Sequence, residues 1–140
     1  WQTYMILGQL YENRGDTAMA DSLWIQLDDT LSSFLEASPN NLFYMQDLGM
    51  CRVELGQRQN DPELTQEGVD LCWKAFMANR NSSYAFRKLV TALSRTAQFN
   101  EIRRAAQLHA EYKVNQKDPF LQQLLGQSAP SGMPSPQPGP

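Results

Sequence analysis

The chain has 140 residues, of which 41% are hydrophobic and 19% are charged, and its formal net charge is −3. This length and composition are typical of one globular domain, and no apolar run approaches the roughly 18 residues that a membrane span needs. Two cysteines are too few for a disulfide framework, and one histidine without a cysteine cluster leaves no recognisable zinc site. The mild net charge also disfavours a nucleic-acid partner.

The charge is unevenly distributed along the chain. Residues 1–41 hold 6 acidic residues and 1 basic residue, a net charge of −5, and residues 42–82 hold 6 and 4, a net charge of −2. Residues 83–117 hold 2 acidic and 7 basic residues, a net charge of +5, and residues 118–140 contribute −1. We therefore expect an anionic partner to prefer the third segment and a basic partner the first.

The hydrophobic pattern is helical along most of the chain, and no alternating strand is evident. The Gly15-Asp16 pair predicts a turn with a helix N-cap, Gly56 is expected to end a helix, and Pro62 to begin one. The expected helices cover residues 3–14, 17–37, 42–55, 62–79, 83–96, 100–116 and 119–125.

The two ends of the chain differ in character. The chain opens on Trp1 within a helical pattern, which predicts that it is a fragment of a longer protein. Residues 127–140 hold five of the eight prolines and no charged residue. Such a stretch neither propagates a helix nor buries a core, so we predict a disordered Pro-rich tail.

An internal repeat is visible in three copies of decreasing clarity. The first copy reads Tyr4-x2-Leu7-Gly8-x2-Tyr11, then Gly15-Asp16, then Ala20-x3-Trp24. The second reads Met45-x2-Leu48-Gly49, then Gly56, then Trp73-Lys74-Ala75-Phe76, with Arg52 in place of a tyrosine. The third reads Phe86-x2-Leu89-Val90-x2-Leu93, then Phe99 and Ile102-x3-Ala106.

These motifs resemble the tetratricopeptide repeat (TPR), in which Gly8 and Ala20 would be small because two helices cross closely there. The resemblance implies an all-α fold, a TPR-like superhelical array of three antiparallel helix pairs plus a short C-terminal capping helix. The domain would cover residues 1–126, with repeats over about 1–41, 42–82 and 83–117 and the cap over 118–126.

The resemblance also implies a concave groove, lined by the first helix of each pair, that binds a peptide or partner helix. The apolar groove residues should be partly exposed, where methionines and aromatic residues can anchor a partner. The groove residues implied are Gln2, Met5, Gln9, Glu12 and Asn13, then Phe43, Gln46, Met50, Val53 and Glu54, then Tyr84, Arg87, Thr91, Ser94 and Arg95.

Two functions are therefore expected from the sequence. The first is a protein-protein interaction module, and the alternative is a non-catalytic accessory or regulatory domain of a larger enzyme or membrane protein. The partner is expected to be a protein or peptide, with nucleic acid disfavoured because no stacking aromatics interleave the arginines. Head-to-tail self-association between the acidic first segment and the basic third segment is a further expectation, and a cytoplasmic location is favoured over export.

No catalytic residue, metal site or cofactor is predicted. His109 has no nucleophile or carboxylate constellation with it, so a packed helix residue is favoured over a general base. Asp28 and Asp29 are adjacent on a helix and therefore point in different directions. Cys51 and Cys72 are interpreted as buried free thiols, with a disulfide left open for an exported protein.

Overall fold

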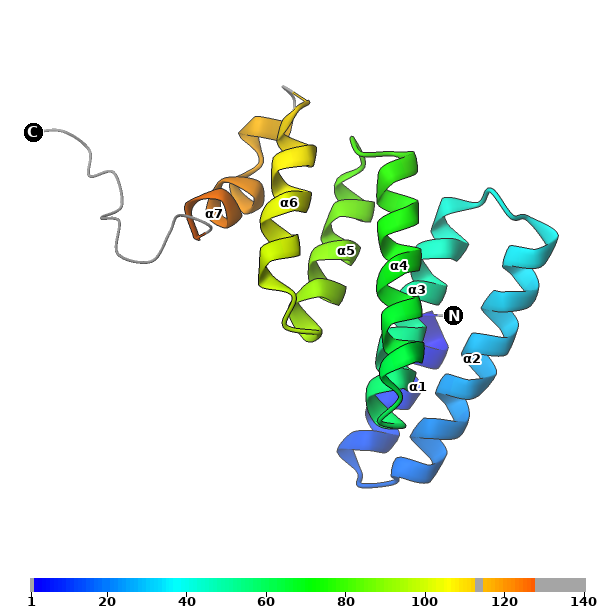
Figure 1. Cartoon of the computed structure of the whole chain (residues 1–140). Coiled ribbons are helices and arrows are strands. Elements are labelled where there is room, and N and C mark those ends of the chain that lie inside the picture. Colours follow the sequence, from blue (N-terminus) through cyan, green and yellow to red (C-terminus); the bar gives the residue numbers. More distant parts are fainter. Residues whose placement is uncertain (1, 113–114, 128–140) are drawn as a thin grey trace, which may run out of the picture. The chain divides into compact units, whose positions relative to one another are not determined.

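The computed structural model describes residues 2–112 and 115–127, and this part of the chain is entirely helical, without a strand. The predicted all-α class is therefore confirmed. The chain divides into two compact units, Trp1–Asn79 and Arg80–Pro140 (Figure 1). Of the predicted tail, residues 128–140 lie outside the described residues.

Unit one, Trp1–Asn79, contains four helices, and each packs against the next along the chain. Short turns join them, and the third helix packs most extensively on the fourth. The helices are α1 (Gln2–Asn13), α2 (Thr17–Ala37), α3 (Leu42–Arg58) and α4 (Pro62–Ala78).

Side-chain caps fix where the helices of unit one begin. The Asp16 carboxylate accepts a hydrogen bond from the Met19 amide at 3.2 Å, and Gly15 adopts a φ of 78° in the turn before it. Asn41 caps α3 in the same way, as does Asp61 for α4. Each cap satisfies an amide that the first helical turn leaves without a backbone partner. The N-cap predicted at Asp16 is confirmed.

A close contact between α3 and α4 is built on glycines. A Cβ atom added at Gly49 would lie 2.7 Å from the Gly68 carbonyl oxygen, and one added at Gly68 would lie 2.6 Å from the Val53 amide nitrogen. A Cβ atom at Gly56 would likewise collide with Thr65 on α4. We call these three residues, Gly49, Gly56 and Gly68, the glycine seam.

The glycine seam corrects the predicted end of the third helix. Gly56 was expected to stop that helix, but α3 continues to Arg58. Gly56 is buried against α4, where a side chain would not fit, so its role is close packing rather than termination.

The hydrophobic core of unit one lies where α2 meets α3. Its buried members share contacts across the two helices, while Met5, Leu35, Leu64 and Leu71 pack against them from the edge. Gly8 brings α1 close to this core, because a Cβ atom there would lie 3.1 Å from the Trp24 indole nitrogen. The buried members are Trp24, Leu27, Leu31, Leu48, Cys51 and Leu55.

Unit two, Arg80–Pro140, contains α5 (Ser83–Arg95), α6 (Phe99–Ala110), the 3-10 helix η1 (Asn115–Lys117) and α7 (Pro119–Gln127). The sixth helix was expected to reach about residue 116, but it ends at Ala110. The Asn115 side-chain amide donates to the His109 carbonyl at 3.0 Å, which satisfies a terminal carbonyl of α6. In α7, the helix expected to cap the array, Leu121 is fully buried.

Candidate functional site

The predicted groove residues of α1 differ in how much surface they present. Met5 is half-buried and packs against the core of unit one. Gln9 is exposed, and its side-chain amide donates to Glu12 and Asn13, both at 3.3 Å. On α1 this predicted set therefore presents mainly a polar edge, formed by Gln9, Glu12 and Asn13.

The predicted residues of α3 divide into exposed and buried positions. Phe43 is 61% exposed in the first turn, and Met50 is half-buried. Gln46 is only 2% exposed, and its side-chain oxygen has no hydrogen-bond partner among the described residues. Val53 was expected to be partly exposed, and this expectation is wrong: Val53 is fully buried, because the missing side chain at Gly68 lets α4 close over it.

An ion-pair cluster at Arg58 engages two of the predicted groove residues. The Arg58 guanidinium lies 2.6 Å from Glu12 on α1, 3.0 Å from Asp21 on α2 and 3.1 Å from Glu54 on its own helix. Its side chain is 11% exposed. The cluster thus ties together the first three helices, and its single guanidinium offsets part of the negative charge of Glu12, Asp21 and Glu54.

Electrostatics keep Arg58 charged despite its burial. Burial lowers the pKa of this guanidinium, but the hydrogen bond from Arg58 to Asp21 and the charges of Glu12 and Glu54 outweigh that effect. The net pKa lies above its ordinary value. The guanidinium carbon also lies 6.0 Å from the centre of the Trp24 ring, within the range of a cation–π contact.

Arg52 forms a second junction, between α2, α3 and α4. Its Nε atom lies 3.2 Å from Asp28, a terminal nitrogen donates to Ser32 at 3.3 Å, and the other terminal nitrogen lies 3.5 Å from Glu67. Neither Arg52 nor Arg58 was predicted as an organising residue. The available signal was the excess of acidic residues in 1–41, which needs nearby cations when the helices pack.

The predicted residues of α5 belong to unit two. Tyr84 is 43% exposed, and the Lys88 ammonium lies 5.3 Å from the centre of its ring. Arg87 lies 3.6 Å from Asp118 and 4.5 Å from the ring centre of Phe120, so it links α5 to the start of α7. Arg95 is exposed at the end of α5.

His109 is fully buried in unit two, in keeping with the packed residue predicted from the sequence. Its ring stacks on Phe86 with 4.2 Å between ring centres. Its Nδ1 atom lies 2.7 Å from the Arg80 carbonyl oxygen and 3.2 Å from the Asn115 side-chain nitrogen.

The predicted buried free thiols are confirmed, because Cys51 and Cys72 are both buried and unbridged. Cys51 donates to the Trp24 carbonyl at 3.5 Å, and Cys72 to the Gln46 carbonyl at 3.7 Å. Burial, with a smaller contribution from Asp28, raises the pKa of Cys51 to about 12. A thiol held in its protonated form is a poor nucleophile.

In residues 2–112 and 115–127, no three His, Cys, Asp or Glu side chains gather as metal ligands would. None of the helices in these ranges combines the length and apolar character needed to cross a bilayer. No protein-family model and no curated protein matches the chain.

Proposed function

We propose that this chain is a helical-repeat protein-interaction module, similar to the TPR family, that binds a peptide or partner helix through the first helices of its pairs. The exposure of Phe43 is the observation that carries the proposal, because a large aromatic side chain that is 61% exposed on a first helix is the kind of anchor that partner proteins bury. Gly8 packed against Trp24 supports the repeat relationship, since the resemblance assigns a close helix approach to that position.

Other predicted groove residues would add contacts with the partner. Tyr84 on α5 is a separate candidate anchor, within unit two. The polar side chains of Gln9 and Asn13 would offer hydrogen bonds at the edge of the proposed surface. The proposed partner is therefore an amphipathic segment with at least one large apolar side chain.

The test is an affinity purification from cells, with quantitative mass spectrometry of the proteins retained by the chain. Changing Phe43 to alanine is expected to reduce retention of a true partner at least tenfold, since anchor residues often contribute more than about 1.4 kcal/mol. Phe99→Ala is the matched control, because Phe99 is 65% exposed but lies on a second helix, α6. The proposed surface is contradicted if retention of the partner is unchanged by Phe43→Ala. It is also contradicted if Phe99→Ala reduces retention as much as Phe43→Ala does.

A different surface favours the alternative of an accessory domain in a larger protein. Four large apolar side chains of α1 are exposed, namely Tyr4, Ile6, Leu7 and Leu10. Exposed apolar patches of this kind mark surfaces that another domain or protein covers.

Hydroxyl-radical footprinting tests this second candidate. Tyr4 should be oxidised readily in the 140-residue chain and should be protected in a longer protein that contains the chain. Equal oxidation of Tyr4 in both would contradict a covering domain, and Tyr112, also exposed but in unit two, serves as the reference residue.

A further inference from the structure

A pocket of about 350 Å³ lies in unit one, between α2, α3 and α4. None of the predicted groove residues lines it. Its volume falls in the range of roughly 300–1,000 Å³ that is usual for small-molecule sites. The pocket is therefore large enough to hold a ligand of about a dozen non-hydrogen atoms, if each takes about the 30 Å³ that a water molecule fills.

The floor of the pocket is apolar. Met45 and Leu48 of α3 are buried beneath it, and the half-buried side chains of Leu35 and Leu71 form walls on α2 and α4. Leu35 and Leu71 sit at the edge of the hydrophobic core without being enclosed by it. An apolar group that entered the pocket would cover their remaining surface, which is favourable in water.

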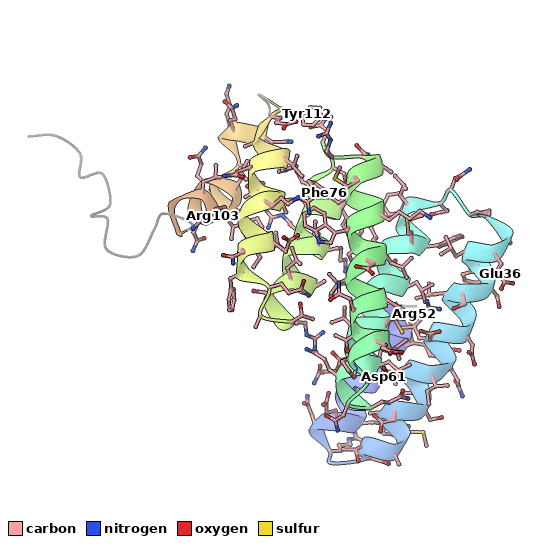
Figure 2. All side chains as sticks on the ribbon, in the orientation of Figure 1. Glu36, Arg52, Asp61, Phe76, Arg103 and Tyr112 are labelled. Atoms are coloured by element: carbon pink, nitrogen blue, oxygen red, sulfur yellow. The ribbon has the colours of Figure 1, made fainter. Side chains whose placement is uncertain are left out.

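Arg52 marks one end of the pocket. It contacts Ser32 on α2 and Glu67 on α4, so these three residues lie at the same level along the helices (Figure 2 labels Arg52 between α2 and α4). Lys74, which also lines the pocket, follows Glu67 by seven residues on the same helix. At 1.5 Å per residue this places the Lys74 backbone about 10 Å further along α4.

The two cations of the pocket differ in their availability. The charge of Arg52 is compensated by Asp28 and Glu67. Lys74 is exposed and makes no ion pair within the described part of the chain. Its flexible four-carbon stem lets the ammonium bend over the apolar floor while staying hydrated. Glu36 stands at the rim on the opposite helix, α2.

We propose that this pocket binds a small carboxylate with an apolar body. The apolar body rests on Leu48 between the walls formed by Leu35 and Leu71, and the carboxylate pairs with the Lys74 ammonium at the rim. The pocket and the proposed protein-binding surface use different residues, so either can fail without the other.

The experiment is an NMR titration of the full chain with 4-phenylbutyrate, whose ring and short chain match the apolar floor. The dissociation constant is expected to be about 1 mM, as for a ligand of this size. Amide shifts should concentrate at the pocket residues. The uncharged analogue 4-phenylbutanol should bind about two- to fivefold more weakly, which is the usual contribution of an exposed ion pair.

Two variants locate the charge that recognises the carboxylate. Lys74→Gln should weaken 4-phenylbutyrate binding about two- to fivefold and leave 4-phenylbutanol binding unchanged. Arg103→Gln is the matched control, because Arg103 is an exposed cation on α6, outside the pocket, and it should change neither affinity.

Several outcomes would overturn the proposal. One is equal affinity of the wild-type chain for the alcohol and the carboxylate, and another is a 4-phenylbutyrate affinity that Lys74→Gln leaves unchanged. Tighter binding of 4-phenylbutylamine would show that Glu36 governs the site instead. Shifts centred on residues outside the pocket, or no shift at 10-fold above the expected dissociation constant of about 1 mM, would also reject it.

Discussion

Two residues outside glycine adopt a left-handed backbone conformation, and they are not equally suited to it. Within the described residues these are Asn60, with a φ of 53°, and Ala97, with a φ of 56°. Both lie in the turn after a helix, α3 and α5 respectively. Asparagine tolerates this region better than most residues, whereas alanine has no compensating side-chain hydrogen bond there. The positive φ of Ala97 therefore lowers the free energy of unfolding of unit two.

Replacing Ala97 by glycine is expected to stabilise unit two by up to about 1 kcal/mol, because glycine adopts positive φ without a Cβ clash. Urea denaturation followed by circular dichroism measures the change. Asn60→Gly is the matched control and should change stability by only a few tenths of a kcal/mol, about the noise of such a measurement. A destabilised Ala97→Gly variant would contradict the strain at this turn.

The buried thiol of Cys51 gives unit one a specific response to alkaline pH. The pKa of Cys51 is raised from an ordinary value of 9.0 to about 12, mainly by burial. Above pH 9 the unfolded chain loses this proton while the folded chain retains it. The contribution of the Cys51 thiol to the free energy of unfolding is therefore fully present below pH 9 and is lost as the pH rises toward 12.

The wild-type chain should accordingly lose about 1 kcal/mol more stability than Cys51→Ala between pH 8 and pH 10, since each pH unit above the unfolded pKa contributes about 1.4 kcal/mol. Urea denaturation at both pH values gives the two slopes. The comparison of slopes removes the constant cost of the cavity that the smaller side chain leaves. Parallel slopes for the two proteins would show that Cys51 titrates in the folded state as it does in the unfolded chain.

At the scale of the helix, the glycine seam decides how α3 and α4 pack. The backbones approach so closely at Gly49 and Gly68 that no side chain fits between them. A helix-favouring substitution in the seam gains about 1 kcal/mol of helix propensity but must push two backbones apart. Overpacking of this kind usually costs more than the propensity returns.

Gly68→Ala is therefore expected to destabilise unit one by about 1–3 kcal/mol, because the new methyl group would meet the Gly49 carbonyl and the Val53 backbone. Gly126→Ala provides the control, since a Cβ atom there has no neighbour within 4 Å. That control should leave stability unchanged or slightly raised. Urea denaturation followed by tryptophan fluorescence reports the first change, and a neutral Gly68→Ala would contradict the close approach of the two helices.

Helix starts were predictable because their signals are local, whereas some helix ends and exposures were not. Asp16 and Pro62 act within one helical turn, so the residues next to them in sequence are enough to predict where these helices begin. The continuation of α3 past Gly56 and the burial of Val53 depend on α4. The early end of α6 depends on the hydrogen bond from Asn115. The pocket was missed for the same reason, since its walls come from three helices.

At the scale of the whole molecule, ion pairs between segments compensate part of the uneven charge. Part of the acidic excess of residues 1–41 is compensated internally, since Glu12 and Asp21 contact Arg58 and Asp28 contacts Arg52. In the basic segment, Arg87 contacts Asp118 of the following segment. The charge left for other molecules is smaller than the segment totals indicate.

Salt tests the expected head-to-tail association of the acidic and basic segments. Sedimentation velocity at about 0.01 M and 1 M salt covers screening lengths from about 30 Å to about 3 Å. We expect any oligomer seen at low salt to dissociate at high salt. An oligomer distribution that does not change over this range would contradict an electrostatic interface between chains.

The glycine seam also has a consequence for the motions of unit one. Backbone in direct contact with backbone leaves no room for water at Gly49 and Gly68. The amide hydrogens around the seam can then exchange with solvent only when α3 and α4 separate, which also exposes the core residues Cys51 and Leu55. Amides near the seam should therefore be among the slowest in the unit to exchange, and those on the exposed face of α1 among the fastest.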